Sequence, residues 1–392
     1  MATMNRILRL MADKNASDVY LSEHAPALIK INGQTLPINS QLLPAGAPLN
    51  LLAEVLEPER IEELRELGEL NMALPITGLG NFRISGFRQR GTYAAVIRFI
   101  PTDIPALDSL NLPPILANLI MEKRGLVLVV GSTGAGKSTT LASMIDHRNE
   151  HATGHILTIE DPIEYLFGNK KSVVNQREVG MDTQSLQIAL RNALRQAPDV
   201  ILIGEIRDRE TMSAAIAYAQ SGHLCLATMH ANNSYQALNR ILSFYPVEVR
   251  PTMLGDLAAA TKAIVSQRLL RTKHGRRAPA VEIMLNTKLV SELIEGSNFS
   301  GVKEAMENSM AEGSQTFEED IARLILKDVV TRSEGLAHAD SPTNLMWRLE
   351  NDFAAARVKA REEDETIQND EPSFTSITLD VYDELPFGQK RH

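Results

Sequence analysis

Hydrophobic and polar positions alternate in two different ways along the chain. Over residues 1–100, short runs at 18–22, 82–90 and 92–100 alternate apolar and polar side chains, which is typical of half-buried strands. An N-terminal helical pattern and a charge-rich helical stretch at 49–70 accompany them. We expect a small α+β domain over 1–100, with an antiparallel sheet that is open on one face.

A proline-rich stretch ends this pattern, and we expect a linker at 101–112. From 113 to 288 the strand-like runs are apolar throughout and alternate with helical patterns, which predicts a parallel sheet wrapped by helices. Residues 289–350 predict helices only. Residues 351–392 are acidic and lack periodicity, so we expect a disordered tail there.

A glycine-rich turn follows the first apolar strand of the second region, and a helical pattern follows the turn. Strand, G-x-x-x-x-G-K-S and helix in that order predict a phosphate-binding loop for a nucleoside triphosphate. Its backbone N–H groups and helix N-terminus would hold phosphate, its lysine would reach the β- and γ-phosphates, and its serine would ligate Mg²⁺. The residues assigned to ATP binding are Gly131, Ser132, Thr133, Gly134, Ala135, Gly136, Lys137, Ser138 and Thr139.

Composition narrows the class of protein. With 392 residues, of which 44% are hydrophobic, we expect a globular protein of two domains or a little more, and no apolar run approaches the length of a membrane span. The single cysteine, Cys225, lies in an apolar run and favours a buried thiol in a reducing, cytoplasmic compartment. A net charge of −9 disfavours nucleic acid as a partner. The basic stretch at 271–277 is either a local basic patch or, as we favour, a solvated turn.

Three further segments supply candidates for hydrolysis. Glu160, Asp161 and Glu164 leave a strand close to the expected phosphate-binding loop, where a cation or a polarised water would relieve their repulsion. An acidic surface loop is the alternative. Glu205 ends the apolar strand 200–203 at the position that holds Mg²⁺ directly or through water, although Gly204 stands where an aspartate is usual.

Two histidines bracket the next apolar strand. His230 follows its end, where an imidazole can donate a hydrogen bond to the γ-phosphate. His223 precedes it and suits a packed core histidine better.

In this order and spacing, the phosphate-binding loop, TIEDPIE, ILIGEIRD and GHLCLATMHANN resemble the secretion and type IV pilus ATPases. The resemblance covers about residues 1–345 and implies a RecA-like P-loop ATPase domain, a smaller N-terminal PAS-like α+β domain and a C-terminal helical extension. It implies a hexameric, Mg²⁺-dependent ATPase in which Glu164 is the general base, Glu205 the Walker B residue and metal ligand alongside Ser138, and His230 part of a histidine box. N-terminal arginines would neutralise transition-state charge; Arg83 and Arg98 are the candidates, with Arg88 and Arg90 as alternatives.

The cysteine count separates branches of this family. Assembly ATPases usually carry a four-cysteine zinc module after the stretch that matches VSQRLLR, and this chain has no cysteine there. This favours the retraction branch, the PilT/PilU family. KLVSELIE at 288–295 replaces the AIRNLIRE expected of PilT, LRQAPD replaces LREDPD, and the tail is long, which together favour PilU.

This resemblance implies a cytoplasmic motor for pilus retraction and twitching motility that supports a PilT-like ATPase. Its partners would be that ATPase and an inner-membrane platform protein, through which it would meet the membrane only peripherally. Two alternatives stay open: a type II secretion or pilus-assembly ATPase, and a regulatory ring subunit without turnover of its own.

Overall fold

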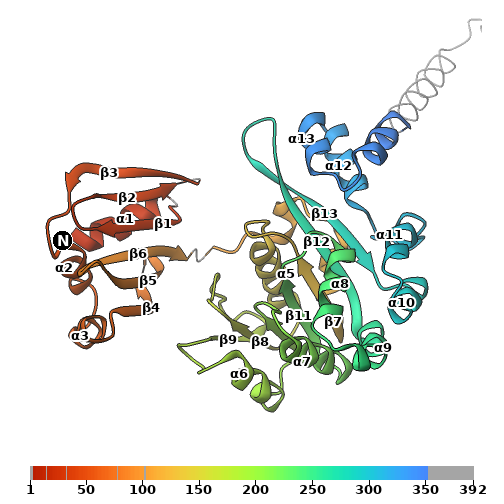
Figure 1. Cartoon of the computed structure of the whole chain (residues 1–392), viewed down its shortest axis with the longest axis horizontal. Coiled ribbons are helices and arrows are strands. Elements are labelled where there is room, and N and C mark those ends of the chain that lie inside the picture. Colours follow the sequence, from red (N-terminus) through yellow and green to blue (C-terminus); the bar gives the residue numbers. More distant parts are fainter. Residues whose placement is uncertain (1–2, 15, 32, 77, 101–102, 352–392) are drawn as a thin grey trace, which may run out of the picture.

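The computed structural model describes residues 3–14, 16–31, 33–76, 78–100 and 103–351. The tail expected at 351–392 lies outside these residues from 352 onward. Within the described part, no helix combines the length and the apolar composition that a membrane crossing requires. Figure 1 shows two bodies of structure joined near residue 101, the first built on an antiparallel sheet and the second on a largely parallel one.

In the described chain up to Ile100, a six-stranded antiparallel sheet has the order β3-β2-β1-β6-β5-β4. Its elements are α1 (Thr3–Asp13), β1 (Asp18–Ser22), β2 (Pro26–Ile31), β3 (Gln34–Leu42), α2 (Ala47–Ala53), α3 (Pro58–Leu67), β4 (Glu69–Ile76), β5 (Gly80–Gln89) and β6 (Thr92–Ile100).

One face of this sheet carries the core. Phe82 and Ile84 on β5 are fully buried, and alternate residues such as Arg83 lie on the other face. Gly86 lets α3 approach the sheet, because a Cβ there would lie 3.0 Å from the Leu64 side chain. The helical stretch expected at 49–70 is two helices, because the backbone before Pro58 is extended and α3 starts at this proline.

The second body contains the remaining helices and strands, and the first of them already lies inside the expected linker at 101–112. They are η1 (Leu107–Leu110), α4 (Ile115–Ile120), β7 (Gly125–Val130), α5 (Lys137–His151), β8 (Gly154–Glu160), β9 (Ser172–Glu178), α6 (Leu186–Ala193), η2 (Leu194–Gln196), β10 (Val200–Ile203), α7 (Arg209–Gln220), β11 (Leu224–Met229), α8 (Ser234–Ser243), η3 (Val247–Val249), α9 (Arg250–Ala260), β12 (Thr261–Arg271), β13 (Arg277–Leu285), α10 (Lys288–Glu295), α11 (Ser300–Glu307), α12 (Phe317–Leu326) and α13 (Arg332–His338).

Among the residues that the structure describes, this sheet has seven strands in the order β13-β12-β7-β11-β10-β8-β9. Its neighbours are parallel except β12 and β13, which pair antiparallel over Ala263–Leu285 to Arg271–Arg277. The expectation of a wholly parallel sheet is therefore wrong at this edge. The basic stretch at 271–277 is the turn region of this hairpin, as expected for a solvated turn.

The central strands are buried on both faces. Val127 and Val129 of β7 join a core with α4 and α5, whereas Leu126 and Leu128 join a core with α7 and α9. This two-sided burial explains why the strands are continuous apolar runs. The α/β fold expected from the sequence is thereby confirmed, with helices on both faces of the sheet (Figure 1).

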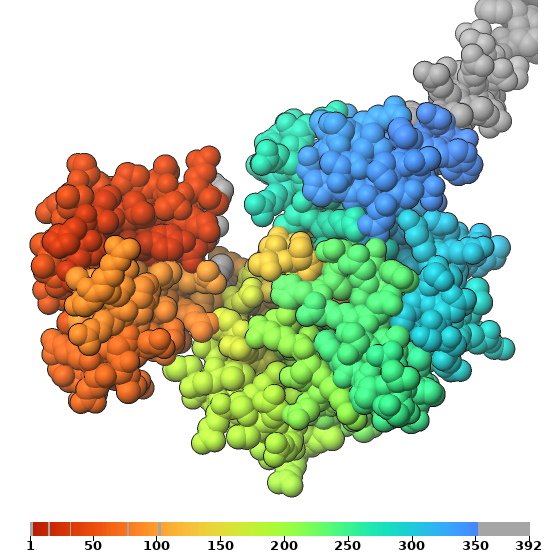
Figure 2. Space-filling view, viewed as in Figure 1, coloured from red at the N-terminus to blue at the C-terminus, as the bar shows by residue number. Residues whose placement is uncertain are grey.

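The segments that flank the sheet also pack. Leu107 of η1 is buried against α5, and the Ser143 hydroxyl donates to the carbonyl of Pro105 at 2.7 Å. The described part of 101–112 thus lies along the second body. At the other end, α12 and α13 form their own small core with the hairpin, around Phe317 and Leu270. Figure 2 shows these C-terminal helices as a cap on the second body.

Candidate active site

The carboxyl ends of β7, β8, β10 and β11 meet at one edge of the seven-stranded sheet and form a cavity of about 480 Å³. Parallel strands place their carboxyl ends at the same edge, so segments distant in the sequence converge there. The predicted residues that line the cavity are Thr133, Gly134, Gly136, Lys137, Ser138, Thr139, Glu160, Asp161, Glu164, Glu205 and His230.

The turn after β7 has the geometry of a phosphate-binding loop. Gly134 and Gly136 have φ of 77° and 90°, in the left-handed region that favours glycine. Gly131 must lack a side chain, because a Cβ would lie 2.6 Å from the carbonyl oxygen of Gln267 on β12. α5 then begins at Lys137, so its free N–H groups and the positive end of its dipole lie beside the cavity.

Lys137 is held inside this turn. Its ammonium donates to the carbonyl oxygens of Gly131 and Ser132, both at 2.9 Å. Burial lowers the pKa of Lys137, and the negative charges of Glu205 and Glu164 partly oppose that shift. The ammonium therefore occupies the anion-binding turn with backbone oxygens as partners, which a phosphate can replace.

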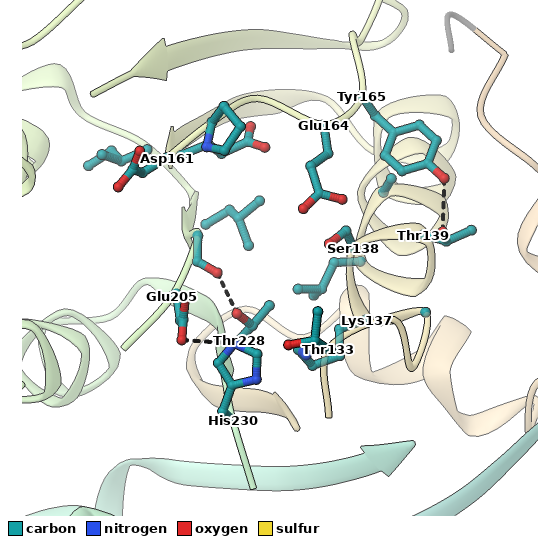
Figure 3. A pocket seen from close by; sticks show the side chains of 18 of the residues that line it. Thr133, Lys137, Ser138, Thr139, Asp161, Glu164, Tyr165, Glu205, Thr228 and His230 are labelled. Atoms are coloured by element: carbon teal, nitrogen blue, oxygen red, sulfur yellow. Dashed lines mark hydrogen bonds and ion pairs between the residues drawn. The ribbon is translucent and has the colours of Figure 1, made fainter. Parts of the chain in front are cut away.

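Hydroxyl groups at the start of α5 also line the cavity. Ser138 lies in the first turn of α5 and faces the cavity (Figure 3). The hydroxyl of the next residue, Thr139, lies 2.8 Å from the Tyr165 hydroxyl, which ties the segment after β8 to α5.

Two glutamates of the expected acidic turn have different environments. Glu160 is buried and accepts hydrogen bonds from Thr158 at 2.7 Å and from Gln176 at 3.2 Å. Burial raises the pKa of Glu160, and these hydrogen bonds oppose the shift. Glu164 instead points its carboxylate into the cavity, on the side of Ser138 (Figure 3). Glu164 is therefore the better placed of the two to meet a water molecule.

Glu205 closes the cavity on the side of β10. Its Oε1 lies 3.2 Å from Nε2 of His230, and its Oε2 lies 2.7 Å from Nη2 of Arg207 (Figure 3 shows the His230 pair). A Cβ at Gly204 would lie 3.2 Å from Cα of Glu160 and from the carbonyl oxygen of Ile159. β8 therefore lies so close that a side chain at this position would require a small shift of the neighbouring backbone.

Several residues of the site were missed in the sequence. Arg207 lines the cavity and pairs with Glu205 and, at 3.8 Å, with Asp161; its position two residues after Glu205 was a usable signal. Thr228 donates to the Gly204 carbonyl, and Gln267 accepts from Thr140 of α5 at 2.7 Å. Thr228 lies two residues before His230 at the end of β11, so its position was also a usable signal. Gln267 had no local signal, because only the pairing of β12 with β7 brings it to the turn.

Arg83 and Arg98 lie on the N-terminal sheet, directly opposite one another on β5 and β6. Arg98 donates from Nε to Asp18 at 2.9 Å, and Lys30 lies 4.0 Å from the other oxygen of Asp18. In the described part of the chain, the cavity lining includes no residue of this sheet. The alternatives Arg88 and Arg90 lie at its β5–β6 hairpin.

Two other candidates lie away from the cavity. His223 precedes β11 at its opposite end and has its Nδ1 3.1 Å from the Ser221 hydroxyl. Cys225 is fully buried in β11, and burial raises the pKa of its thiol. The expectation of a buried thiol agrees with the placement of Cys225, whereas His223 is only half-buried and is therefore not a packed core histidine.

The donor set of the cavity fits a hard cation. No group of three or more His, Cys, Asp or Glu able to hold a metal occurs in the described ranges. Mg²⁺ in nucleotide sites needs only one or two protein oxygens, with phosphate and water as its remaining ligands. The Ser138 hydroxyl and the Glu205 carboxylate both line the cavity and satisfy this requirement.

Comparisons with known proteins agree with this geometry. A family model described as "Type II/IV secretion system protein" matches residues 2–334. The chain is 41% identical over 388 residues to the type IV pilus ATPase PilU of Pseudomonas aeruginosa, covering 98% of each protein. It is 34% identical over 341 residues to the retraction ATPase PilT of the same organism, covering 87% of this chain and 99% of PilT.

A solved structure supports the same assignment. The pilus retraction motor PilT with bound ADP is 36% identical, has a TM-score of 0.81, and the match covers 88% of this chain and 98% of that one. The chain therefore belongs to the type II/IV secretion-system ATPase family, and within it to the PilT/PilU type of pilus ATPase.

Proposed function

We propose that the chain is a Mg²⁺-dependent ATPase that powers pilus retraction and twitching motility in support of a PilT-like motor. The proposal of ATP hydrolysis rests on one cavity, in which Lys137 and Ser138 face Glu164 and the Glu205–His230 pair. Binding and hydrolysis need these groups together: a cation for the phosphates, a metal ligand, a base and a sensor.

Each side chain has a distinct role in this proposal. Lys137 exchanges its two carbonyl partners for the β- and γ-phosphates, where its positive charge neutralises theirs. Glu164 accepts a hydrogen bond from the attacking water and raises its nucleophilicity. Glu205 and Ser138 hold Mg²⁺ and its water shell, and His230 donates to the γ-phosphate while its contact with Glu205 sets its position.

Arg83 and Arg98 are proposed to supply positive charge at the transition state. In register across β2, β1, β6 and β5 lie Lys30, Asp18, Arg98 and Arg83, that is, three cations and one carboxylate. Arg83 and Arg98 face each other as like charges, and Asp18, which pairs with Arg98, offsets only one of the three positive charges in the row. Such a row suits contact with a nucleotide, either in a closed arrangement of one chain or across a ring interface.

The proposed assembly is a cytoplasmic homo-hexamer that acts at an inner-membrane platform protein, next to a PilT-like ring. Support comes from the pilus ATPases PilU and PilT among its relatives. Residues 288–295 form α10, whose Val290 and Ile294 are buried while Leu289 is 53% exposed. Residues 288–295 thus form a helix whose sequence, KLVSELIE, differs from the AIRNLIRE pattern linked to motor output, and this difference favours an accessory role.

Imaging of labelled pili in cells that contain this protein as their only retraction-type ATPase tests the proposal. We expect no retraction alone, and retraction once a PilT-like ring without ATPase activity is added. Retraction by this protein alone would contradict the accessory role. Absence of retraction under both conditions, with hydrolysis intact in the purified protein, would contradict the role in retraction but not the enzymatic assignment.

A further inference from the structure

The short loop after β11, which carries His230 into the cavity, is hydrogen-bonded to a cluster of buried and half-buried polar side chains. Three consecutive residues, Asn232, Asn233 and Ser234, each bond to a side chain outside the loop. The backbone N–H of Ser234 donates to Oε1 of Glu282 on β13 at 2.8 Å, and the Ser266 hydroxyl donates to the same oxygen at 2.9 Å. His230 itself faces the other way, toward Glu205.

Arg268 on β12 is the centre of this cluster. One arm of its guanidinium donates to the Asn232 carbonyl at 3.2 Å and pairs with Asp340, and the other donates to the His338 carbonyl. The guanidinium stacks on the buried ring of Phe317, with 3.9 Å between its carbon and the ring centroid. A planar group with several donors can meet all these partners at once, which an ammonium cannot.

Asp340 completes the connection from the C-terminal side. One oxygen pairs with Arg268, and the other accepts from Asn233 Nδ2 at 2.8 Å. The same Asn233 side chain caps α8 by accepting from the N–H of Gln236 at 2.9 Å. Asp340 and Arg268 are only 23% and 17% exposed, so this pair is screened far less than a surface ion pair.

The cluster also borders the phosphate-binding turn. Gln267, the residue before Arg268, accepts from Thr140 of α5 and packs against the turn at Gly131. One stretch of β12 therefore contacts the turn, the His230 loop and the C-terminal helices. A shift of the C-terminal helices would reach the cavity through this stretch.

We propose that Arg268 and Asp340 are positioning residues that hold His230 against Glu205, so that the C-terminal helical region controls the rate of ATP turnover. The inference rests on the proposed hydrolysis at this cavity. Neither residue touches the reacting atoms in this scheme, and Asp340 lies outside the residues that line the cavity. Its loss should therefore slow turnover without weakening nucleotide binding.

The first test compares the full-length variants Asp340→Ala, Arg268→Lys and the double variant with wild type. We expect each single variant to lower kcat about fivefold, with the affinity for a fluorescent ATP analogue within about twofold of wild type. The double variant should be no slower than the slower single variant, because both changes break one connection. Asp328→Asn is the matched control: its partner Lys273 lies on the same hairpin, remote from the His230 loop, and kcat should not change.

A kcat within about twofold of wild type for both single variants would overturn the proposal. A loss of analogue affinity that matches the loss of kcat would also overturn it, because the pair would then support the fold or the binding surface.

Amide hydrogen exchange supplies a readout that does not depend on hydrolysis. In Asp340→Ala, the N–H groups of 231–237 should exchange faster, while those of the phosphate-binding turn stay as in wild type. Unchanged exchange at 231–237 would overturn the positioning role even if the protein proved not to hydrolyse ATP.

Discussion

The two sheets of this molecule carry charge in opposite ways. At the carboxyl edge of the seven-stranded sheet, Lys137 lies among Glu164, Glu205 and Glu160, and the mixed charges surround a cavity. On the open face of the N-terminal sheet, Arg83 and Arg98 lie side by side in a cross-strand row and are absent from the lining of that cavity.

Strand direction accounts for this difference. Parallel strands bring their ends, and the loops that follow, to one place, which makes a pocket able to hold a ligand by itself. An antiparallel sheet spreads its charged residues along a flat surface. The seven-stranded sheet can therefore bind and position a nucleotide. The N-terminal sheet can act only on a nucleotide that the seven-stranded sheet holds.

Loss of the central cation should have the largest effect. Lys137→Ala removes the charge that meets the β- and γ-phosphates, and we expect ATP turnover to fall by about a hundredfold or more. Phosphate release from the purified protein measures this, and a binding assay with an ATP analogue should show weakened affinity. If Lys137→Ala also supports twitching as well as wild type, the chain is a regulatory subunit rather than a motor.

Glu164, which follows β8, and Glu205, which follows β10, should both be needed for turnover. Glu164→Gln removes the proposed base, so turnover should fall at least about tenfold, or about 1.4 kcal/mol of barrier, with nucleotide binding largely intact. Glu205→Ala should lower turnover to a similar extent, because it removes a proposed ligand of Mg²⁺ or of its water shell.

Glu160→Gln serves as the control for this pair, because an amide oxygen can still accept from Thr158 and Gln176. Its turnover should change less than that of Glu164→Gln. Equal turnover in all three variants and wild type would show that the base has been assigned to the wrong carboxylates.

The sequence predicted those parts of the site that lie just after an apolar strand. An apolar strand ends shortly before each of the turn at 131–138, Glu164, Glu205 and His230. Because the ends of parallel strands converge, these residues meet at one cavity. Gln267 could not be predicted, because only the pairing of β12 with β7 brings it to the turn. The antiparallel β13 was missed for a similar reason: a strand buried on both faces has the same pattern in either direction.

The arginine row should have a smaller effect than the cavity. We expect Arg83→Gln or Arg98→Gln to lower kcat about fivefold with little change in nucleotide affinity, because charge from this sheet would matter most at the transition state. Steady-state kinetics at saturating ATP measures it. Arg65→Gln on α3, where the arginine pairs with Glu62 of the same helix, is the control and should leave kcat unchanged. No effect from either variant of the row would remove the N-terminal sheet from the chemistry.

The smallest expected effect concerns Glu282, a carboxylate on the large sheet that lies outside the cavity. Burial raises its pKa, hydrogen bonds from Ser234 and Ser266 oppose the shift, and the nearby charge of Asp340 adds to it. Because the folded protein then holds this proton more tightly than the unfolded chain, wild-type stability falls as pH rises from about 4.5 through the raised pKa.

Glu282→Gln keeps an acceptor oxygen for both donors and has no charge to bury. The gap between the melting temperature of Glu282→Gln and that of wild type should therefore shift in favour of the variant by about 2 °C between pH 5 and pH 8. A gap that stays constant or shrinks over that range would mean that Glu282 is ionised in the folded protein and that its hydrogen bonds compensate for the burial of its charge.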